Sequence, residues 1–207
     1  MCSICGGNYP LELVRKASQT MVHRGPDFSG EFSDGVVALA HNRLSIIDLD
    51  SEANQPFTSP FCPHLVLVFN GEIYNYLEIK QELTKFGIPF FTQSDTEVLL
   101  HAFVYLGEKC IEKFNGDFAF CILDKRDSSL FLARDRLGNK PLFYYWENEK
   151  FFFASEIKAL LQIKSFEFDL QEVSKWLLFG NGGENKTIYK GILNFPPAHF
   201  ARFANGD

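Results

Sequence analysis

A run of short apolar segments in the middle of the chain limits the folds that are open to it. The segments at 118–123, 130–134, 141–146 and 151–155 have the length and composition of β-strands. Polar turns separate them, at Lys125-Arg126-Asp127-Ser128 and at Glu147-Asn148-Glu149-Lys150. Strands that are joined by such short turns pair with their neighbours in antiparallel fashion. We therefore predict a β-meander over residues 118–155.

Helical patterns stand on both sides of this meander. Apolar residues recur at helical spacing after Pro10 and again from Tyr76 to Phe86, where Gly87 ends the helix. A further helix starts at Ser94-Asp95-Thr96-Glu97, which has the form of a capping box in which Glu97 reaches back to Ser94. Shorter helices are predicted at 156–161 and 169–178.

Further extended segments complete the prediction. They are expected at 3–7, 36–41, 44–47 and 64–69, and the last of them stops at Asn70-Gly71. Helices that pack on antiparallel strands indicate the α+β class.

The composition restricts the partners of the chain. Its 207 residues suit one domain, and its formal net charge is -6. An acidic protein is poorly suited to nucleic acid or to an anionic membrane. No apolar run approaches the ~18 residues of a membrane helix, and the N-terminus lacks the pattern of a signal peptide. Five scattered cysteines indicate reduced thiols, so we expect a cytoplasmic protein.

Cys2 directly follows the initiator methionine. If Met1 is removed, Cys2 carries both a thiol nucleophile and a free α-amine. The pKa of an α-amine is about 7.7–8.0, which suits a base that works near neutral pH. A nucleophile can be activated by its own terminal amine. The alternative is an ordinary buried cysteine in a first strand, since free Cys is among the most buried residue types.

Three polar clusters stand at predicted strand ends or loops, where functional residues concentrate. Arg43 can clamp a carboxylate with its planar fork, or it can form a surface ion pair. Asn70-Gly71 can be a turn, but its side-chain amide and backbone N–H can also form an oxyanion hole. Asp95 suits the first turn of any helix, and it can also hold a ligand ammonium.

Taken in order, these stretches resemble the class II glutamine amidotransferase domain of the asparagine synthetase family. The resemblance covers Met1 to about residue 204. It is carried by Cys2, His23-Arg24-Gly25-Pro26-Asp27, His41-Asn42-Arg43-Leu44-Ser45-Ile46, Gln55-Pro56, Asn70-Gly71-Glu72-Ile73-Tyr74-Asn75, Ser94-Asp95-Thr96-Glu97, Asn115-Gly116-Asp117-Phe118-Ala119, Ala133-Arg134-Asp135 with Gly138 and Lys140-Pro141-Leu142, and Phe153-Ala154-Ser155-Glu156-Ile157-Lys158-Ala159-Leu160.

The resemblance implies a fold, a reaction and a set of roles. The fold is the N-terminal-nucleophile (Ntn) hydrolase sandwich, a four-layer αββα arrangement with two antiparallel sheets. Glutamine is hydrolysed to glutamate and ammonia through a thioester. Cys2 is the nucleophile, with its α-amine as base. Asn70 and Gly71 form the oxyanion hole. Arg43 and Asp95 hold the α-carboxylate and the α-ammonium, and the glutamine pocket is completed by Leu44, Ser45, Ile46, Ile47 and Glu72.

The chain departs from the family pattern in two places. Ser3 stands where the family normally has glycine, so the backbone approach to the substrate is expected to be tighter. The chain also ends where the glutaminase domain closes, so the C-terminal synthetase domain that would receive ammonia is expected to be missing. That domain would use ATP and Mg, whereas no cofactor is expected in the present one. The resemblance does not decide the oligomeric state, and a homodimer is one possibility.

Other functions remain as alternatives. A catalytically inactive binding or regulatory module would explain Ser3 as a sign of decay, although the retained Cys2, Arg43, Asn70 and Asp95 argue against it. An amidotransferase of the amino-sugar or phosphoribosylamine type is a second alternative. Cys2-Ser3-Ile4-Cys5 has CxxC spacing, but a zinc site needs further ligands and no second CxxC is present. We therefore expect no metal.

Overall fold

The protein, described here by a computed structural model, is defined over residues 1–180 and 182–204. Short 3₁₀ helices (η) stand beside the α-helices and strands. In chain order the elements are β1 (Ser3–Gly7), α1 (Leu11–Gln19), η1 (Val22–Arg24), β2 (Phe28–Ser33), β3 (Ala38–Arg43), η2 (Ser51–Ala53), β4 (Leu65–Ile73), α2 (Tyr76–Lys85), α3 (Asp95–Leu106), η3 (Gly107–Lys109), α4 (Cys110–Lys113), β5 (Gly116–Asp124), β6 (Ser129–Arg134), β7 (Phe143–Glu147), β8 (Lys150–Ala154), α5 (Ile157–Leu160), α6 (Leu170–Phe179), β9 (Ile192–Asn194) and β10 (Phe200–Phe203).

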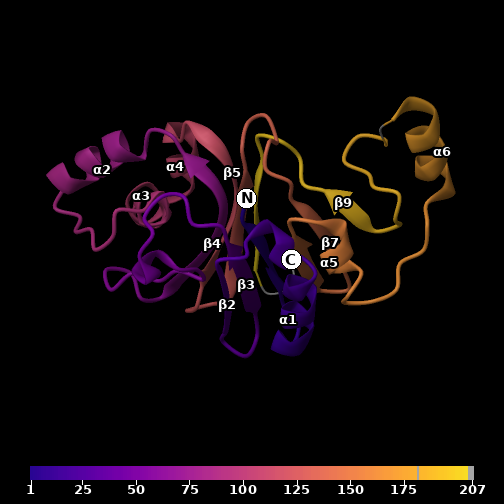
Figure 1. Ribbon diagram of the computed structural model, residues 1–207, viewed down its shortest axis with the longest axis horizontal. Coiled ribbons are helices and arrows are strands. Elements are labelled where there is room, and N and C mark those ends of the chain that lie inside the picture. Colours follow the sequence, from indigo (N-terminus) through magenta and orange to yellow (C-terminus); the bar gives the residue numbers. More distant parts are fainter. Residues whose placement is uncertain (181, 205–207) are drawn as a thin grey trace.

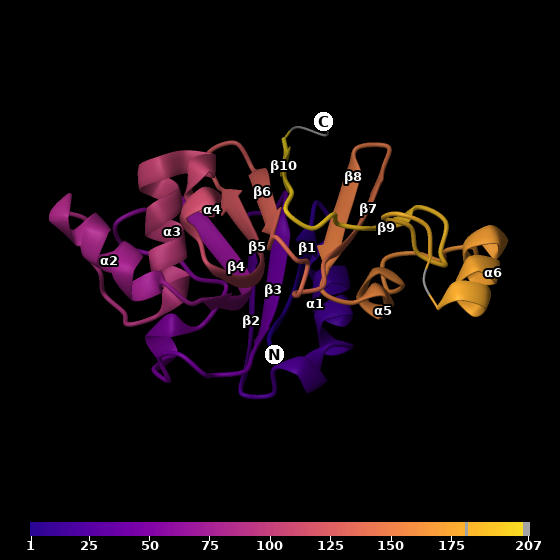
Figure 2. The same cartoon turned by 90° about the horizontal axis from the view of Figure 1, so that it is seen from above.

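The strands form two antiparallel sheets. The six-stranded sheet has the order β2-β3-β1-β8-β7-β9, and the four-stranded sheet has the order β10-β6-β5-β4. In Figure 2 the layers follow one another across the molecule, with α2 and α3 outside the four-stranded sheet and α1 and α5 outside the six-stranded one. The predicted four-layer αββα sandwich is therefore confirmed.

Strict alternation of side chains along the strands builds the layers. In β4, Leu67 and Phe69 pack under the helices α2 and α3, whereas Val66 and Val68 point between the sheets. In β8, Phe153 lies between the sheets and Phe152 packs against α1 and α5. Because successive strand residues face opposite sides, both faces of each sheet are covered by apolar contacts.

Helix α6 lies apart from the four layers. It projects beyond the edge of the six-stranded sheet, next to β9 (Figure 1). Its N-terminus is capped by Asp169, which accepts hydrogen bonds from the N–H groups of Gln171 and Glu172. No helix within the described ranges, 1–180 and 182–204, is both long and apolar enough to cross a bilayer.

The strand predicted to stop at Asn70-Gly71 continues to Ile73. Asn70 pairs with Ala119 and Gly71 pairs with Phe118 of β5. A Cβ atom at Gly71 would lie 2.2 Å from the Asp117 carbonyl oxygen. The glycine is therefore required by the close approach of two strands and not by a turn.

Three further expectations need correction. Residues 44–47 are not a strand, because β3 ends at Arg43, and the neighbouring β2 was not predicted. The predicted meander is divided, because β5 and β6 belong to one sheet and β7 and β8 to the other. The capping box is half formed: Ser94 Oγ accepts from the Glu97 N–H at 3.2 Å, but the Glu97 carboxylate accepts from Phe91 and Thr92 instead.

Candidate active site

Side-chain alternation brings the predicted residues together at one end of the layer between the sheets. Ile4, Leu39 and Val68 all face this inter-sheet layer. Every second residue of a strand faces the same side. Steps of two from Ile4, Leu39 and Val68 therefore place the side chains of Cys2, Arg43 and Asn70 toward the same inter-sheet layer. They line one cavity, together with every other residue predicted for the site except Ser45.

The Cys2 thiol lies against the backbone of the loop that follows β3. The Leu44 N–H donates to Cys2 Sγ at 3.4 Å, and the thiol lies 3.6 Å from the Leu44 carbonyl oxygen. Burial raises the pKa of the Cys2 thiol, an effect that is partly offset by the Leu44 hydrogen bond and by the charge of Arg43. At neutral pH the group is therefore a thiol, which needs a base to become a nucleophile.

The side chain of Asn70 carries a donor without an acceptor. Asn70 is 1% exposed, and its Nδ2 makes no hydrogen bond with the described residues. A buried amide donor without a partner is costly. Because Asn70 lines the cavity beside Cys2, this donor can serve a ligand there.

The backbone of β4 supplies a second donor. At the free edge of this strand the N–H groups point outward at every second residue. Those of Leu67 and Phe69 donate to Phe57 O at 2.9 Å and to Gln55 Oε1 at 2.6 Å. The N–H of Ile73 donates to Asp95 Oδ2 at 3.0 Å.

The N–H group of Gly71 also points outward from this edge of β4, but no described residue accepts a hydrogen bond from it. Its opposite residue, Phe118, uses both its N–H and its carbonyl oxygen to bond Asp135. Gly71 and Phe118 therefore form a non-hydrogen-bonded pair, and the Gly71 N–H faces the cavity edge of β4. The Asn70 amide and the Gly71 N–H thus belong to residues that line the same cavity as the Cys2 thiol.

Arg43 is held by the loop that follows it. Its guanidinium donates to the carbonyl oxygen of Asp50 at 3.0 Å and to Asn54 Oδ1 at 2.7 Å, and it also bonds the carbonyl oxygen of Asp48. Arg43 is only 5% exposed. A ligand carboxylate at this arginine would share or replace these carbonyl contacts.

Asp95 and Glu72 place negative charge on the same wall. Burial raises the pKa of Asp95 to about 6, the Ile73 hydrogen bond opposes this shift, and the charge of Glu72 adds to it. Asp95 stands at the first position of α3 because Ser94 caps that helix. The site therefore has a cation at the end of β3 and carboxylates from α3 and β4.

Ser45 does not line the cavity. Its N–H donates to Asp27 Oδ2 at 2.8 Å, and the Asp27 N–H donates to the Arg43 carbonyl oxygen at 3.0 Å. These bonds fix the start of the loop that carries Leu44, Ile46 and Ile47.

Sequence reasoning missed three polar or charged residues of the cavity lining, Gln55, Thr96 and Lys140, and the apolar Phe69. Gln55 and Thr96 are both 5% exposed, and Gln55 Nε2 donates to Thr96 Oγ1 at 3.3 Å. Phe69 contributes beside them, and Lys140 brings a second cation. Gln55, Thr96 and Lys140 all stand within stretches that carried the family resemblance, which was the available signal.

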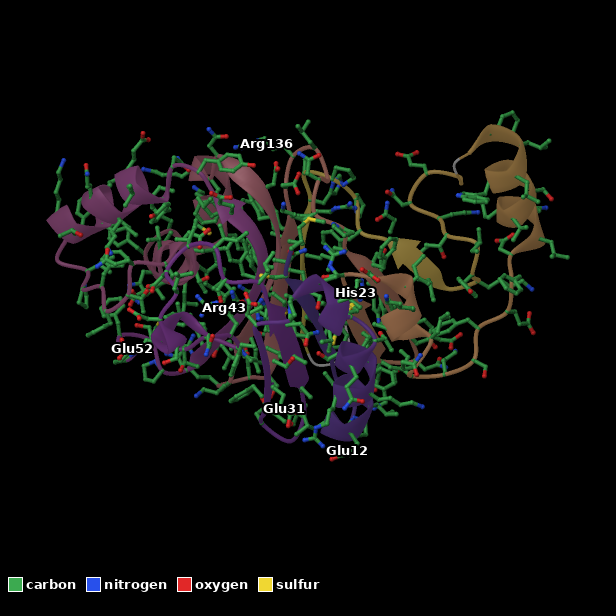
Figure 3. The ribbon with its side chains drawn as sticks, viewed as in Figure 1. Glu12, His23, Glu31, Arg43, Glu52 and Arg136 are labelled. Carbon is green, nitrogen blue, oxygen red and sulfur yellow. The ribbon has the colours of Figure 1, made fainter. Side chains whose placement is uncertain are left out.

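Two histidines near these elements are poorly suited to act as bases. His41 is fully buried, its Nε2 lies 3.1 Å from the Phe69 carbonyl oxygen, and burial lowers its pKa to about 3. His23 contacts Glu156 at 3.2 Å. Figure 3 shows His23 on the α1 and α5 side of the molecule, whereas Arg43 lies on the side of β4. Neither histidine lines the cavity.

The side chain of Ser3 does not narrow the cavity. Ser3 is fully buried, and its hydroxyl accepts a hydrogen bond from Asn42 Nδ2 at 3.0 Å on the α1 side of the sheet. The expected tighter approach to the substrate is therefore not produced by this side chain.

All five cysteine side chains are free thiols. No group of three or more His, Cys, Asp or Glu residues converges to hold a metal within residues 1–180 and 182–204.

Comparisons with known proteins agree with this geometry. Residues 1–207 match a family described as glutamine amidotransferase domain. The chain is 37% identical to asparagine synthetase (glutamine-hydrolyzing) 1 of Bacillus subtilis, over 100% of this chain and 34% of that protein. It is 39% identical to asparagine synthetase B (glutamine-hydrolyzing) of Escherichia coli K12, over 79% of this chain and 30% of that protein. The chain thus spans about a third of the length of these relatives.

A solved structure shares the architecture. The glutamine phosphoribosylpyrophosphate amidotransferase of B. subtilis, complexed with ADP and GMP, superposes with a TM-score of 0.72 at 20% identity, over 99% of this chain and 47% of that one. Together with the two antiparallel sheets, this likeness confirms the predicted Ntn hydrolase fold.

Proposed function

The chain belongs to the glutamine amidotransferase domain family, and from this membership we propose that it hydrolyses the side-chain amide of L-glutamine. The proposal rests on one arrangement. Asn70 Nδ2 and the Gly71 N–H have no acceptor among the described residues, and both residues line the same cavity as the Cys2 thiol. Two donors beside a nucleophile are what an acyl-transfer site needs.

In the proposed reaction, Cys2 Sγ attacks the carboxamide carbon and the thiol proton passes to a base. The carbonyl oxygen becomes an oxyanion that accepts hydrogen bonds from Asn70 and Gly71. Collapse of this intermediate breaks the C–N bond, and the protonated base supplies the proton with which ammonia leaves. A thioester remains on Cys2, and water hydrolyses it to glutamate and the free thiol.

The α-amine of Cys2 is the proposed base. Removal of Met1 would free this amine, which is then tied to the same residue as the nucleophile. Its ordinary pKa of about 7.7–8.0 allows a neutral fraction at physiological pH. The raised pKa of the Cys2 thiol makes such a base necessary. While Met1 is attached, the same nitrogen belongs to an amide and is not basic.

The two charged walls suit the two ends of the amino acid. Arg43 would bind the α-carboxylate, and Asp95, assisted by Glu72, would bind the α-ammonium. The loop residues Leu44, Ile46 and Ile47 would cover the side chain between them. The reaction needs no cofactor in this domain.

The ammonia acceptor would be an ATP- and Mg-dependent synthetase domain. The two named relatives carry "asparagine synthetase (glutamine-hydrolyzing)" in their names, and each is about three times as long as the matched segment. Free thiols throughout the chain suit a reducing cytoplasm, and a homodimer would leave the proposed chemistry unchanged.

Two cysteine variants test the proposal. Cys2→Ala and Cys5→Ala would be prepared with Met1 removed, each N-terminus would be verified by mass, and ammonia release from glutamine would be measured. We expect no release from Cys2→Ala and near-normal release from Cys5→Ala. Cys5 is a matched control because it lies three residues away in β1 but faces α1, and burial raises its pKa to about 12.

Retention of Met1 gives a second arm of this experiment. We expect the chain that keeps Met1 to release no ammonia, and we expect activity to return when an aminopeptidase exposes Cys2. Equal turnover with and without Met1 would exclude the α-amine as base. Equal loss in both cysteine variants would reject Cys2 as the nucleophile and favour a binding module.

A further inference from the structure

A row of polar side chains crosses the outer face of the six-stranded sheet directly behind the nucleophile. Ser3 of β1 and Ser29 of β2 are both paired with Asn42 of β3, so the three residues occupy one rung of the sheet. Asn42 Nδ2 donates to Ser3 Oγ at 3.0 Å, and Ser29 Oγ donates to Asn42 Oδ1 at 2.7 Å. We call Ser3, Asn42 and Ser29 the polar rung.

The polar rung is buried and fully bonded at its centre. Ser3 is 0% exposed and Asn42 is 1% exposed. Asn42 Nδ2 also lies 3.0 Å from the carbonyl oxygen and from the hydroxyl oxygen of Ser18 in α1. The two N–H groups of Asn42 Nδ2 are thus shared among three acceptors, Ser3 Oγ and the two oxygens of Ser18, which join β1, β3 and α1 at this point.

The position of the rung links it to the cavity on the other side of the sheet. Ser3 is followed toward the N-terminus by Cys2, and Asn42 is followed by Arg43. The register ends at the pair of Ser3 and Asn42. Continued by one residue, it would set Cys2 opposite Arg43 with both side chains on the other face, and both residues line the cavity there. The charge of Arg43 indeed acts on the Cys2 thiol.

We propose that Ser3 is a positioning residue, whose hydrogen bond to Asn42 fixes the register between the nucleophile Cys2 and the arginine that holds the substrate carboxylate. This inference rests on the proposed function. β1 begins at Ser3, so beyond this pair Cys2 is restrained by the bond from Arg24 Nε to its carbonyl oxygen at 2.9 Å and by the contacts of its thiol with the Leu44 backbone. Without the Ser3 hydroxyl, Cys2 has more freedom relative to Arg43.

The test compares two reagents for Cys2 in the chain from which Met1 has been removed. One is 6-diazo-5-oxo-L-norleucine, which carries the amino-acid group and must be held by Arg43 when it meets the thiol. The other is iodoacetamide, which needs only the thiol. For Ser3→Ala and for Ser3→Gly we expect the first reaction to slow roughly three- to tenfold, the range that one buried hydrogen bond supports. The second reaction should stay within about twofold.

Ser18→Ala is the matched control. It removes another acceptor of the same Asn42 amide but leaves Ser3 and Cys2 unchanged. Its thermal midpoint should fall about as much as that of Ser3→Ala, while its ratio of the two rates should equal that of the parent. An unchanged ratio in both Ser3 variants would overturn the positioning role while leaving the proposed function in place. A parent that reacts with iodoacetamide but not with the glutamine analogue would overturn the proposed function and this inference with it.

Discussion

The carboxamide of Asn70 is a buried donor that has no acceptor among residues 1–180 and 182–204. Replacing Asn70 with alanine should lower kcat by ~10²–10³ and change KM little, because the donor acts on charge that develops only in the tetrahedral intermediate. Steady-state ammonia release over a range of glutamine concentrations would measure both constants. A change confined to KM would make Asn70 a contact of the ground state.

Asp95 should make the protein less stable as the pH rises. Its pKa of about 6 in the fold lies above the value of about 3.9 in an unfolded chain. The folded state therefore binds the proton more tightly, and the stability gained from this proton is complete below about pH 4 and lost as the pH passes 6.

Asp95→Asn should remove this loss, because the amide oxygen can still accept from Ile73 and carries no charge. We expect the variant to be more stable than the parent by on the order of 1–3 kcal/mol at pH 8, and to show no such gain at pH 4. Urea unfolding at both pH values would measure this. The same variant should bind glutamine worse. A gain that is equal at both pH values would remove ionisation as its cause.

At the scale of elements, the N-cap of α3 affects both the stability of the protein and the position of a cavity residue. Ser94 Oγ accepts from the Glu97 N–H, and Asp95 follows at the first helical position. Ser94→Ala should cost about 1 kcal/mol of unfolding free energy. It should also raise KM for glutamine, because the turn that orients Asp95 loosens.

Asp169→Ala is a suitable control for this prediction. It removes the cap of α6, which lies outside the cavity lining, so it should cost a similar free energy and leave KM unchanged. Urea unfolding and initial rates on the two variants would separate stability from function. Equal KM values in both variants would contradict a role of the α3 cap in binding.

Local patterns predicted most elements but failed where pairing between strands decides the outcome. Asn-Gly is a strong turn signal, yet Gly71 stays in β4, paired with Phe118, and glycine is needed there because a Cβ atom would lie 2.2 Å from the Asp117 carbonyl oxygen. Residues 44–47 look like a strand, but the Arg43 guanidinium bonds the backbone of 47–50 and folds it into a loop. The first contact joins two different strands, and the second depends on where a single guanidinium lies. Neither can be read from the local pattern of apolar and turn residues.

The same limit applies to the cavity. Arg43, Asn70 and Asp95 were predicted because their short stretches resemble a known family, and the structure places them around one cavity. Gln55 could not be assigned a role from its sequence, because its importance comes from the edge of β4 that it covers. Lys140 likewise joins the lining through the path of the loop that follows β6.

At the scale of the whole molecule, the layer between the sheets should make the two halves unfold together. Phe120 lies under the helices of the four-stranded sheet, whereas both tryptophans, Trp146 and Trp176, belong to β7 and α6 in the other half. Phe120→Ala should cost about 3–5 kcal/mol. The midpoints followed by tryptophan fluorescence and by far-UV circular dichroism should shift by the same amount. A shift of the dichroism transition alone would show that the halves unfold separately.

The outer edge of β4 has a consequence for contacts between molecules. β4 is the last strand of its sheet, and an open strand edge is a template on which another chain can pair and start an aggregate. Here Phe57, Gln55 and Asp95 occupy the outward N–H groups on both sides of Gly71. A strand from another molecule would need several unbonded N–H groups in a row to pair with this edge. Between Leu67 and Ile73 it would find only the N–H of Gly71, which lies at a cavity. The contacts that occupy the N–H groups beside Gly71 therefore also protect this edge from polymerisation.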